Sequence, residues 1–518
     1  MDELIMYTVV GIYLLAIAGL SFIGYSQTKT ASDFLVGGRG MNPIVMALSY
    51  GATFISASAI VGFGGVAAAF GMGIQWLTFL NIFVGVIIAF IVFGRPTRKL
   101  GQRLGSSTFA QFLGDFYNSG MIRRFIAIVI FVGMPLYAAV VMKGGAVFVE
   151  RLFGIDYTLA LILFTVIVTL YVITGGIKGV MYTDAMQATI MFSCMAFMLF
   201  WFYHSMGLSF SEANRELGAI SDLVPQAMKE MGHQGWTAMP ATGSPQWYRL
   251  VTSLILGVGI GCLAQPQLVV RFMMVKGDKQ LNQGVVVGTL FLFITVGAIY
   301  HIGALSNLFF LKEYGKVASE AMHDIDKIIP LFIDEGMPKW FGAIFMLCIL
   351  SASMSTLSAQ FHTMGAAVGV DLIGRHIQSP SKTKNTTLVV RLGVIVSIII
   401  SFIICNLLSA GIIARGTALF MGVCASTFLP SYTAALFWRR VNKVGAKWSL
   451  WVGLLVSLFV MLFFYESTAA PIGLCQQFFG TPVMITSGAI KMIDPMIFSL
   501  PLSTAALIIG SLLTSKRE

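Results

Sequence analysis

The feature that most constrains the fold of this chain is the recurrence of long apolar segments along its 518 residues. Hydrophobic residues make up 57% of the sequence and charged residues only 11%, which excludes an ordinary water-soluble protein. A helix needs about 20 apolar residues to cross a bilayer. We therefore predict an all-α integral membrane protein, a single transmembrane transporter domain over 1–518, with about 13 spans at 4–25, 43–70, 75–95, 122–149, 156–174, 182–205, 248–273, 284–311, 338–373, 388–408, 412–438, 445–465 and 495–514.

The basic residues indicate how the spans are oriented. If the N-terminus lies outside, most of the 33 Lys and Arg residues fall in inner loops or at inner helix ends, among them Arg98, Arg123 and Arg271. An odd number of spans then places the C-terminus in the cytoplasm, as in a protein of the plasma (inner) membrane. The net charge of +11 reflects this topology and contact with an anionic lipid leaflet, so it does not indicate nucleic-acid binding.

Several classes of function are excluded because their motifs are missing. The six cysteines have neither CxxC nor metal-ligand spacing, and we expect them to be reduced apolar residues of the helices. The sequence contains no Walker loop and no HExxH or GxSxG motif. Coupling to ATP is therefore not indicated, and we predict that the chain is not an enzyme.

Two runs of small and hydroxyl-bearing residues stand out within the apolar spans. Residues 51–58 read GATFISAS, and residues 351–358 read SASMSTLS. Hydroxyl and backbone groups are costly in hydrocarbon unless protein or a ligand satisfies them. Neutral oxygens without a carboxylate suit a hard, weakly charged cation. The two runs therefore predict a sodium site.

Glycines predict breaks in two spans. Glycines lie at 51, 62, 64 and 65 in the second span, and at 257, 259 and 261 before Pro266 in the seventh. Glycine frees the backbone, and proline removes one helical hydrogen bond. Because the two spans are five helices apart, the breaks predict inverted repeats over 43–205 and 248–438. The alternative is that these glycines only allow close helix packing.

Five segments of the sequence resemble the sodium/solute symporter family of proline, pantothenate, monocarboxylate and sugar carriers. They are GGR at 37–39, ALSYGATFISAS at 47–58, GGIKGVMYTDAMQ at 175–187, QPQLVVRF at 265–272 and SASMSTLSAQ at 351–360. The resemblance follows nearly the whole chain in order. It implies a leucine-transporter-like inverted-repeat fold, in which helices 2–6 and 7–11 are the repeats and helices 2 and 7 are broken.

The resemblance also implies a set of sodium ligands. The backbone carbonyls of Ala52, Ile55 and Ala352 would join the hydroxyls of Ser355 and Thr356. Ser355 and Thr356 follow Ala352 by three and four positions and therefore share a helix face with it. The alternative is that both hydroxyls bond to carbonyls of their own helix.

Two further residues are similar to family positions near this site. Asp184 resembles an aspartate that supports the sodium site without contacting the ion, and the alternative is that it pairs with Lys178 or caps its helix. Arg39 resembles an arginine that tethers the inner gate, and it also fits the positive-inside pattern. Proline carriers have an aspartate where this chain has Phe54, so we expect one sodium ion per cycle.

In the family, the solute lies between the two helix breaks and the fourth and eleventh helices. The corresponding candidate solute-binding residues are Thr53, Ser56, Tyr137, Lys143, Gly261, Cys262 and Pro266. Val258 and Cys262 stand where the proline carriers have a tryptophan and a tyrosine, which disfavours proline itself.

Lys143 is the most informative of these candidates. A lone cation in a membrane span is a functional candidate, and a solute carboxylate would be its natural partner. However, Lys143 lies seven residues from Glu150, about 10 Å along a helix axis. The alternative is that it extends to the outer interface or pairs within the protein.

We therefore predict a sodium-coupled symporter that imports a small organic solute, a carboxylate such as a monocarboxylate or a pantothenate-like anion. Its partners are the solute, sodium and the lipid bilayer, without nucleic acid. The alternatives are a sodium-coupled amino-acid carrier, a non-transporting sensor of the same fold, and a proton-coupled carrier. The last would require an ionisable residue within the cation site.

Overall fold

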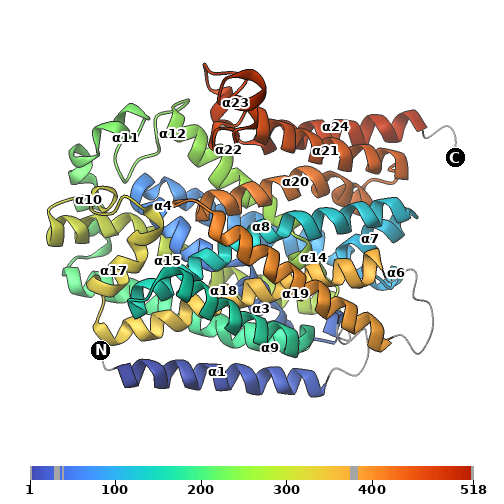
Figure 1. Cartoon of the computed structure of the whole chain (residues 1–518), viewed down its shortest axis with the longest axis horizontal. Helices are drawn as coiled ribbons and strands as arrows, with labels where there is room; N and C mark the ends of the chain where they lie inside the picture. The colour runs from blue at the N-terminus through green and yellow to red at the C-terminus, as the bar shows by residue number, and fades with distance from the viewer. Residues whose placement is uncertain (1–2, 28–34, 38–39, 374–382, 515–518) are drawn as a thin grey trace.

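The structure is a computed structural model that describes residues 3–27, 35–37, 40–373 and 383–514. All regular elements in these ranges are helices, and most of them run along the horizontal axis of Figure 1. We call the end of the bundle on the left of that view the loop end, and it carries α10 (Phe210–Ala219), α11 (Gln226–Glu230) and α12 (Pro245–Tyr248). We call the opposite end the basic end, and it carries α6 (Arg95–Leu104) and α7 (Phe109–Phe116).

Long apolar helices form the body of the bundle. They are α1 (Glu3–Ser26), α8 (Gly120–Phe153), α9 (Tyr157–Met206), α15 (Asp278–Tyr314), α18 (Lys339–Ala366), α19 (Thr383–Leu407), α20 (Ile413–Phe437), α21 (Lys443–Phe463) and α24 (Pro495–Thr514). Among the described residues, ten helices are long and apolar enough to cross a membrane, and three apolar helices are shorter. The predicted all-α membrane architecture is confirmed, whereas the number of spans stays a prediction.

The lipid-facing side of the bundle is visible in α19. Its residues Leu392, Ile399 and Ile403 expose 52%, 53% and 55% of their surface. Large apolar side chains exposed in a row would be an aggregation hazard in water, but they are the expected surface of a helix that faces hydrocarbon.

α9 covers two predicted spans without a gap. A straight helix of its 50 residues would be about 75 Å long. However, Phe164 and Ser353 both lie against Gly145, and Cys194 lies against the carbonyl oxygen of Ile344. Ile344 and Ser353 are less than three turns apart in α18. The chain must therefore reverse its direction between Phe164 and Cys194.

The second predicted span is interrupted at mid-length. α3 (Pro43–Phe54) ends where Ile55 adopts an extended backbone conformation with ψ 98°. The chain continues as a short π-helical segment, η2 (Ser58–Gly62), followed by α4 (Phe63–Phe70). The hydroxyl-rich run identified in the sequence therefore lies across an interruption of the helix.

The seventh predicted span is interrupted as well. It consists of η6 (Arg249–Gly257), α13 (Val258–Gly261), η7 (Cys262–Ala264) and α14 (Pro266–Phe272). Between η7 and α14, Gln265 has an extended backbone with ψ 115°. Proline disfavours the helical conformation of the residue before it and is well tolerated in the first turn of a helix, so the Gln-Pro pair explains where α14 begins.

Close backbone approaches hold both interrupted helices against their neighbours. A Cβ at Gly65 in α4 would overlap the carbonyl oxygen of Ile325 in η8 (Ile325–Lys327). A Cβ at Gly261 would come within 2.6 Å of the carbonyl oxygen of Met421 in α20. Glycine is required at both contacts because any side chain would separate the two main chains.

Shorter helices connect the long ones. They are η3 (Gly71–Ile74), α5 (Gln75–Ile82), η4 (Phe83–Gly94), η5 (Ile220–Leu223), α16 (Ala318–Ala321), α17 (Ile328–Gly336), η9 (Ala367–Leu372), α22 (Glu466–Ile472), α23 (Leu474–Phe479) and η12 (Ile490–Met492). Apart from Arg95, the residues of α6 and α7 fall between two predicted spans. α6 is charged, yet it buries Thr97, Arg98 and Gly101 against the bundle, so it packs as an amphipathic helix.

Candidate functional site

The two hydroxyl-rich runs meet at a buried contact between the end of α3 and the middle of α18. The hydroxyl of Ser355 donates to the carbonyl oxygens of Ala52 at 2.8 Å and of Ala352 at 3.3 Å. The hydroxyl of Thr356 donates to the carbonyl oxygen of Thr53 at 2.9 Å. The side chains of Thr53, Ser355 and Thr356 are at most 1% exposed. The structure thus brings Ala52, Ala352, Ser355 and Thr356 together, although their runs are 300 residues apart.

The donor set at this contact fits an alkali cation. It consists of uncharged carbonyl and hydroxyl oxygens, which suit a hard cation of low charge. Among the described residues, no group of three or more His, Cys, Asp or Glu side chains is placed to hold a metal ion. Ser355 and Thr356 bond across to α3 and not only within α18. These hydrogen bonds would therefore break if α3 and α18 moved apart.

Two of the predicted residues contribute less to this geometry. The amide of Ile55 donates to the carbonyl oxygen of Gly51 at 2.9 Å, which places Ile55 at the last turn of α3 beside the contact. Its own carbonyl leaves the helical direction because the backbone is extended there. The predicted gating residue Arg39 lies outside the described residues.

A buried ion pair adjoins the contact. Asp184 of α9 accepts hydrogen bonds from Arg271 of α14 at 2.8 Å and from Ser49 of α3 at 2.6 Å, all through Oδ2. Arg271 also donates to Thr53 Oγ1 at 2.5 Å, and Thr53 Oγ1 lies 3.4 Å from the carbonyl oxygen of Ser355. The pair is therefore connected to the α3–α18 contact through a single hydroxyl group.

The second carboxylate oxygen of Asp184 has no hydrogen-bond partner among the described residues, although it is buried. A buried anionic oxygen without a donor is costly, so this atom is available to a cation or a water molecule. Asp184 thus lies next to the candidate ion site, and its supporting role there stays a prediction. The alternative partner Lys178 donates instead to the carbonyl oxygen of Gln27 at 3.1 Å.

Arg271 is the residue that the sequence reasoning missed. The sequence pattern predicts it at an inner loop or helix end, but Arg271 is 1% exposed and bonded to α3 and α9. The available signal was its position five residues after Pro266, on a helix that a Gln-Pro pair starts inside the bundle. A cation there needs an anionic partner within the core.

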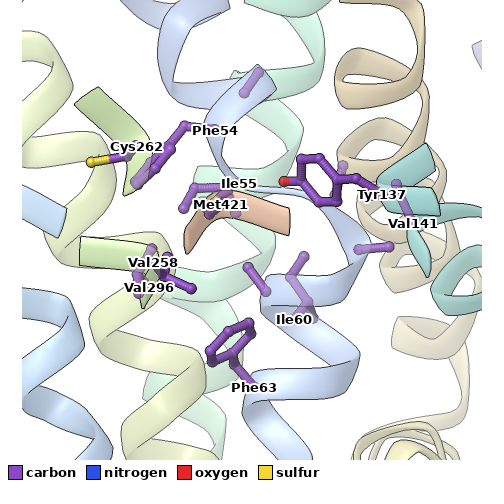
Figure 2. Close-up of a cluster of buried hydrophobic side chains, with 14 of the residues drawn as sticks. Phe54, Ile55, Ile60, Phe63, Tyr137, Val141, Val258, Cys262, Val296 and Met421 are labelled. Atoms are coloured by element: carbon purple, nitrogen blue, oxygen red, sulfur yellow. The ribbon is translucent and has the colours of Figure 1, made fainter. Parts of the chain in front are cut away.

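Apolar side chains fill the space between the two helix interruptions. In Figure 2 they converge from α3, η2, α4, α8, α13, η7, α15 and α20, and the labelled members are Phe54, Ile55, Ile60, Phe63, Tyr137, Val141, Val258, Cys262, Val296 and Met421. We call these ten residues the central cluster. All of them are at most 5% exposed, and none carries a charge.

The structure does not bring the predicted solute-binding residues together in one place. Tyr137 and Cys262 belong to the central cluster, and the Tyr137 ring stacks on Phe420 with centroids 5.3 Å apart. Ser56 lies at the first interruption and hydrogen bonds with Ser58. Gly261 and Pro266 flank the second interruption, where Gly261 provides the close approach to α20. Thr53 faces the Asp184–Arg271 pair instead of the central cluster.

Lys143 does not extend into the central cluster. Its ammonium group donates to the carbonyl oxygens of Leu408 and Ser409, each at 2.8 Å, just past the end of α19. Lys143 therefore caps the carbonyl end of a helix, where a cation is favoured by the helix dipole. Of the two interpretations of Lys143 given by the sequence, the structure supports pairing within the protein.

The two ends of the bundle differ in their ion pairs and cavities. At the basic end, Arg123 binds Asp371 at 2.7 Å, Arg98 binds Asp278 at 2.6 Å, and the cavity beside Arg271, His362 and Asp371 measures only about 30 Å³. At the loop end, a cavity of about 330 Å³ is present beside α4. The cavity at the basic end is thus smaller than the one at the loop end.

A bundle of long apolar helices, two of them interrupted, is the architecture of a membrane carrier, and the buried neutral oxygens at the first interruption are its candidate cation site. The chain belongs to the sodium:solute symporter family, which matches residues 34–453. It is accordingly a transporter and not an enzyme, and sodium is its coupling ion. The family resemblance seen in the sequence is confirmed.

Individual relatives cover most of the chain. The osmoregulated proline transporter OpuE of Bacillus subtilis is 26% identical over 450 residues, which are 86% of each chain. A sodium/pantothenate symporter of Haemophilus influenzae is also 26% identical over 450 residues, 86% of this chain and 87% of the relative. A solved Na⁺-coupled sialic acid symporter in a substrate-bound outward-open state shares the fold with a TM-score of 0.75, at 18% identity over 99% of this chain and 97% of that one.

Proposed function

We propose that this transporter imports a small organic carboxylate together with sodium, and that the sodium ion binds between α3 and α18. Its ligands would be the carbonyl oxygens of Ala52, Ile55 and Ala352 and the hydroxyls of Ser355 and Thr356. The observation that carries the proposal is the direct bonding of Ser355 and Thr356 to the last turn of α3. An ion at this contact would replace those hydrogen bonds and hold the two helices together.

The solute class is supported by chemistry that the relatives share. Proline and pantothenate, the solutes in the names of the relatives, both carry a carboxylate. The central cluster has no charged side chain, and Lys143 is bonded elsewhere. The negative charge of a bound carboxylate would therefore be balanced by the sodium ion itself, which gives a physical reason for obligatory coupling. An apolar lining also favours a solute with a hydrocarbon portion.

Alternating access would follow from the same contact. With the proposed inverted repeats over 43–205 and 248–438, sodium binding at α3 and α18 stabilises the form open at the loop end and completes the solute site. We propose that the loop end faces outward and the basic end faces the cytoplasm, because the basic end collects the positive-inside residues. Low cytoplasmic sodium then empties the site after the bundle opens inward.

The test of the ion site is sodium-dependent uptake by proteoliposomes that contain a Ser355→Ala/Thr356→Ala variant. Each lost ligand is worth about 1 kcal/mol, so the sodium concentration for half-maximal uptake should rise by roughly tenfold or more. Ser353→Ala is the matched control, because its hydroxyl bonds at 2.8 Å to Ile349 of its own helix. An unchanged sodium requirement in the double variant would refute the site.

The test of the solute class is a thermal-shift screen of the purified protein against short-chain acids, pantothenate, amino acids and sugars, in sodium and in potassium. A carboxylate that stabilises the protein only in sodium supports the proposal. Stabilisation by a sugar or by another uncharged solute alone would reject the carboxylate class while leaving sodium coupling in place.

A further inference from the structure

The loop-end cavity contains two arginines that the transport cycle described above does not use. The cavity measures about 330 Å³, and its lining includes Arg249 of η6, Arg415 of α20 and Asp324, together with apolar Val66, Phe70 and Leu254. We call it the arginine cavity. Val66 and Phe70 belong to α4, the half-helix that leads from the loop end to the first interruption, so the cavity adjoins the route to the central cluster.

Neither arginine has an acidic partner among the described residues. Arg249 donates one long hydrogen bond, to the sulfur atom of Met231 at 3.8 Å, and its buried Nε has no hydrogen-bond partner among the described residues. Arg415 donates through Nε and Nη2 to one carbonyl oxygen, that of Gly411, at 3.3 and 3.2 Å. A guanidinium group has five N–H donors, so both side chains retain donors for a ligand.

The contrast with Arg151 at the same end of the bundle is informative. Arg151 binds Asp334 at 3.0 Å and Glu335 at 3.2 Å, so its charge is neutralised by the protein. Arg249 and Arg415 make no such ion pair in the described part of the chain, although the buried Asp326 carboxylate interacts with Arg415 through space. They lie at the wall of a partly enclosed space, where a charge acts more strongly than in open water.

The one carboxylate in the lining does not offset the two cations. Asp324 Oδ1 accepts the amide of Asp326 at 3.1 Å and the amide of Gly411 at 3.2 Å, so it serves the backbone turns on either side. Gly411 lies two residues before the start of α20 at Ile413. The positive end of that 25-residue helix therefore points toward the same region and adds to its affinity for anions.

We propose that the arginine cavity is a capture site for a small organic carboxylate, with the carboxylate at Arg249 and Arg415 and the hydrocarbon portion against Val66, Phe70 and Leu254. It would hold the solute before it enters the central cluster. The proposal rests on the proposed import of a carboxylate, but the site itself needs no sodium. Guanidinium groups bind carboxylates through paired hydrogen bonds, and the apolar wall selects organic over inorganic anions.

The first experiment labels arginines of the wild-type protein with phenylglyoxal in sodium-free potassium buffer and measures each site by peptide mass spectrometry. Phenylacetate is the probe, because it combines a carboxylate with an aromatic ring, and phenylacetamide is its neutral counterpart. We expect phenylacetate to slow labelling of Arg249 and Arg415 several-fold, with no effect of phenylacetamide and none on Arg151. Equal protection by inorganic phosphate, or no protection by phenylacetate, would overturn the proposal.

The second experiment measures phenylacetate binding by saturation-transfer NMR in the same buffer. Arg249→Gln and Arg415→Gln should each abolish or strongly weaken the signal, and Arg151→Gln, which removes a paired arginine at the same end, should retain it. Undiminished binding by either cavity variant would count against the site. Because both experiments omit sodium, they are independent of the transport assay: loss of sodium-dependent uptake in wild type would reject the proposed function without changing their outcome.

Discussion

Two cations lie deep in the helical bundle, and the protein neutralises them in different ways. Arg271 is paired with Asp184 beside the α3–α18 contact, and it also bonds to two side chains of α3. Lys143 has no carboxylate within ion-pair distance among the described residues, and it bonds to two carbonyl oxygens at the end of α19. Burial alone therefore does not make a cation part of the candidate ion site: Arg271 adjoins that site through its partners, whereas Lys143 caps the end of a helix.

The largest effect should follow from breaking the Arg271 pair. Asp184→Asn would leave a buried guanidinium without its counter-charge, which costs about 3–5 kcal/mol. We expect a matching loss of unfolding free energy in detergent and loss of sodium-dependent uptake. Arg124→Gln is the control, because that exposed arginine bonds only to the carbonyl oxygen of Gly120 in its own helix. Normal stability of Asp184→Asn would show that the pair is not what holds these helices.

Removing the charges of both Asp184 and Arg271 tests whether the two residues act as a pair. In the Asp184→Asn/Arg271→Gln double variant no uncompensated charge remains, so part of the stability lost in each single variant should return. The coupling free energy from the double-mutant cycle should reach about 1–3 kcal/mol. Additive losses would mean that Asp184 and Arg271 act independently. Uptake should stay impaired even where stability recovers, since Thr53 loses its link to the pair.

A smaller effect is expected at Lys143. Lys143→Met keeps the length and apolar character of the side chain but removes two charge-assisted hydrogen bonds, which together cost about 1.5–3 kcal/mol. The variant should therefore unfold at lower temperature while its half-saturating solute concentration stays unchanged. Exposed Lys312→Met serves as the control for loss of a lysine at the loop end. A raised half-saturating concentration in Lys143→Met would instead restore Lys143 as a solute ligand.

The smallest expected effect is a pH dependence of local stability at His233, whose neutral side chain lies against the end of α4. Its Nδ1 accepts the amide of Gly235 at 3.0 Å, and its Nε2 lies 3.1 Å from the carbonyl oxygen of Ala69, near the end of α4. Burial lowers the pKa of His233. The folded protein therefore resists protonation, and the contribution of neutral His233 is present above the usual histidine pKa of about 6.5 and is lost as pH falls below it.

Hydrogen exchange would measure this pH dependence. Amides of 231–239 should exchange faster at pH 5.5 than at pH 7.5 after correction for intrinsic rates. His233→Asn keeps a hydrogen-bonding side chain that does not titrate, so its exchange should show no such difference. A pH effect of equal size in His233→Asn would assign it to another group.

The sequence allowed the α3–α18 contact to be predicted because its signal is local on each side. Small hydroxyl-bearing residues are unusual in hydrocarbon, and the spacing of Ala352, Ser355 and Thr356 places them on one helix face. Gln265 and Pro266 likewise mark the start of α14 through their own conformational preferences. Such signals depend on neighbouring residues only, so they can be read without a structure.

The partners of Arg271 and Lys143 could not be predicted in that way. Asp184 is 87 positions from Arg271, and the carbonyl groups that bind Lys143 are more than 260 positions away and have no side-chain signature. A basic residue near a predicted helix end also fits the positive-inside pattern. The sequence therefore does not distinguish the buried Arg271 from an arginine at the membrane surface. The helix α6 could not be predicted for a similar reason. Its charged residues are typical of a loop, and the burial of Thr97 and Arg98 depends on distant parts of the chain.

The contact between Gly65 and Ile325 sets how closely α4 and η8 approach each other. The two surfaces that touch there are bare peptide groups, so closure needs no side chain to swing and no charge to be neutralised. The close contact therefore depends on the missing side chain, and a single methyl group on Gly65 would hold α4 and η8 apart.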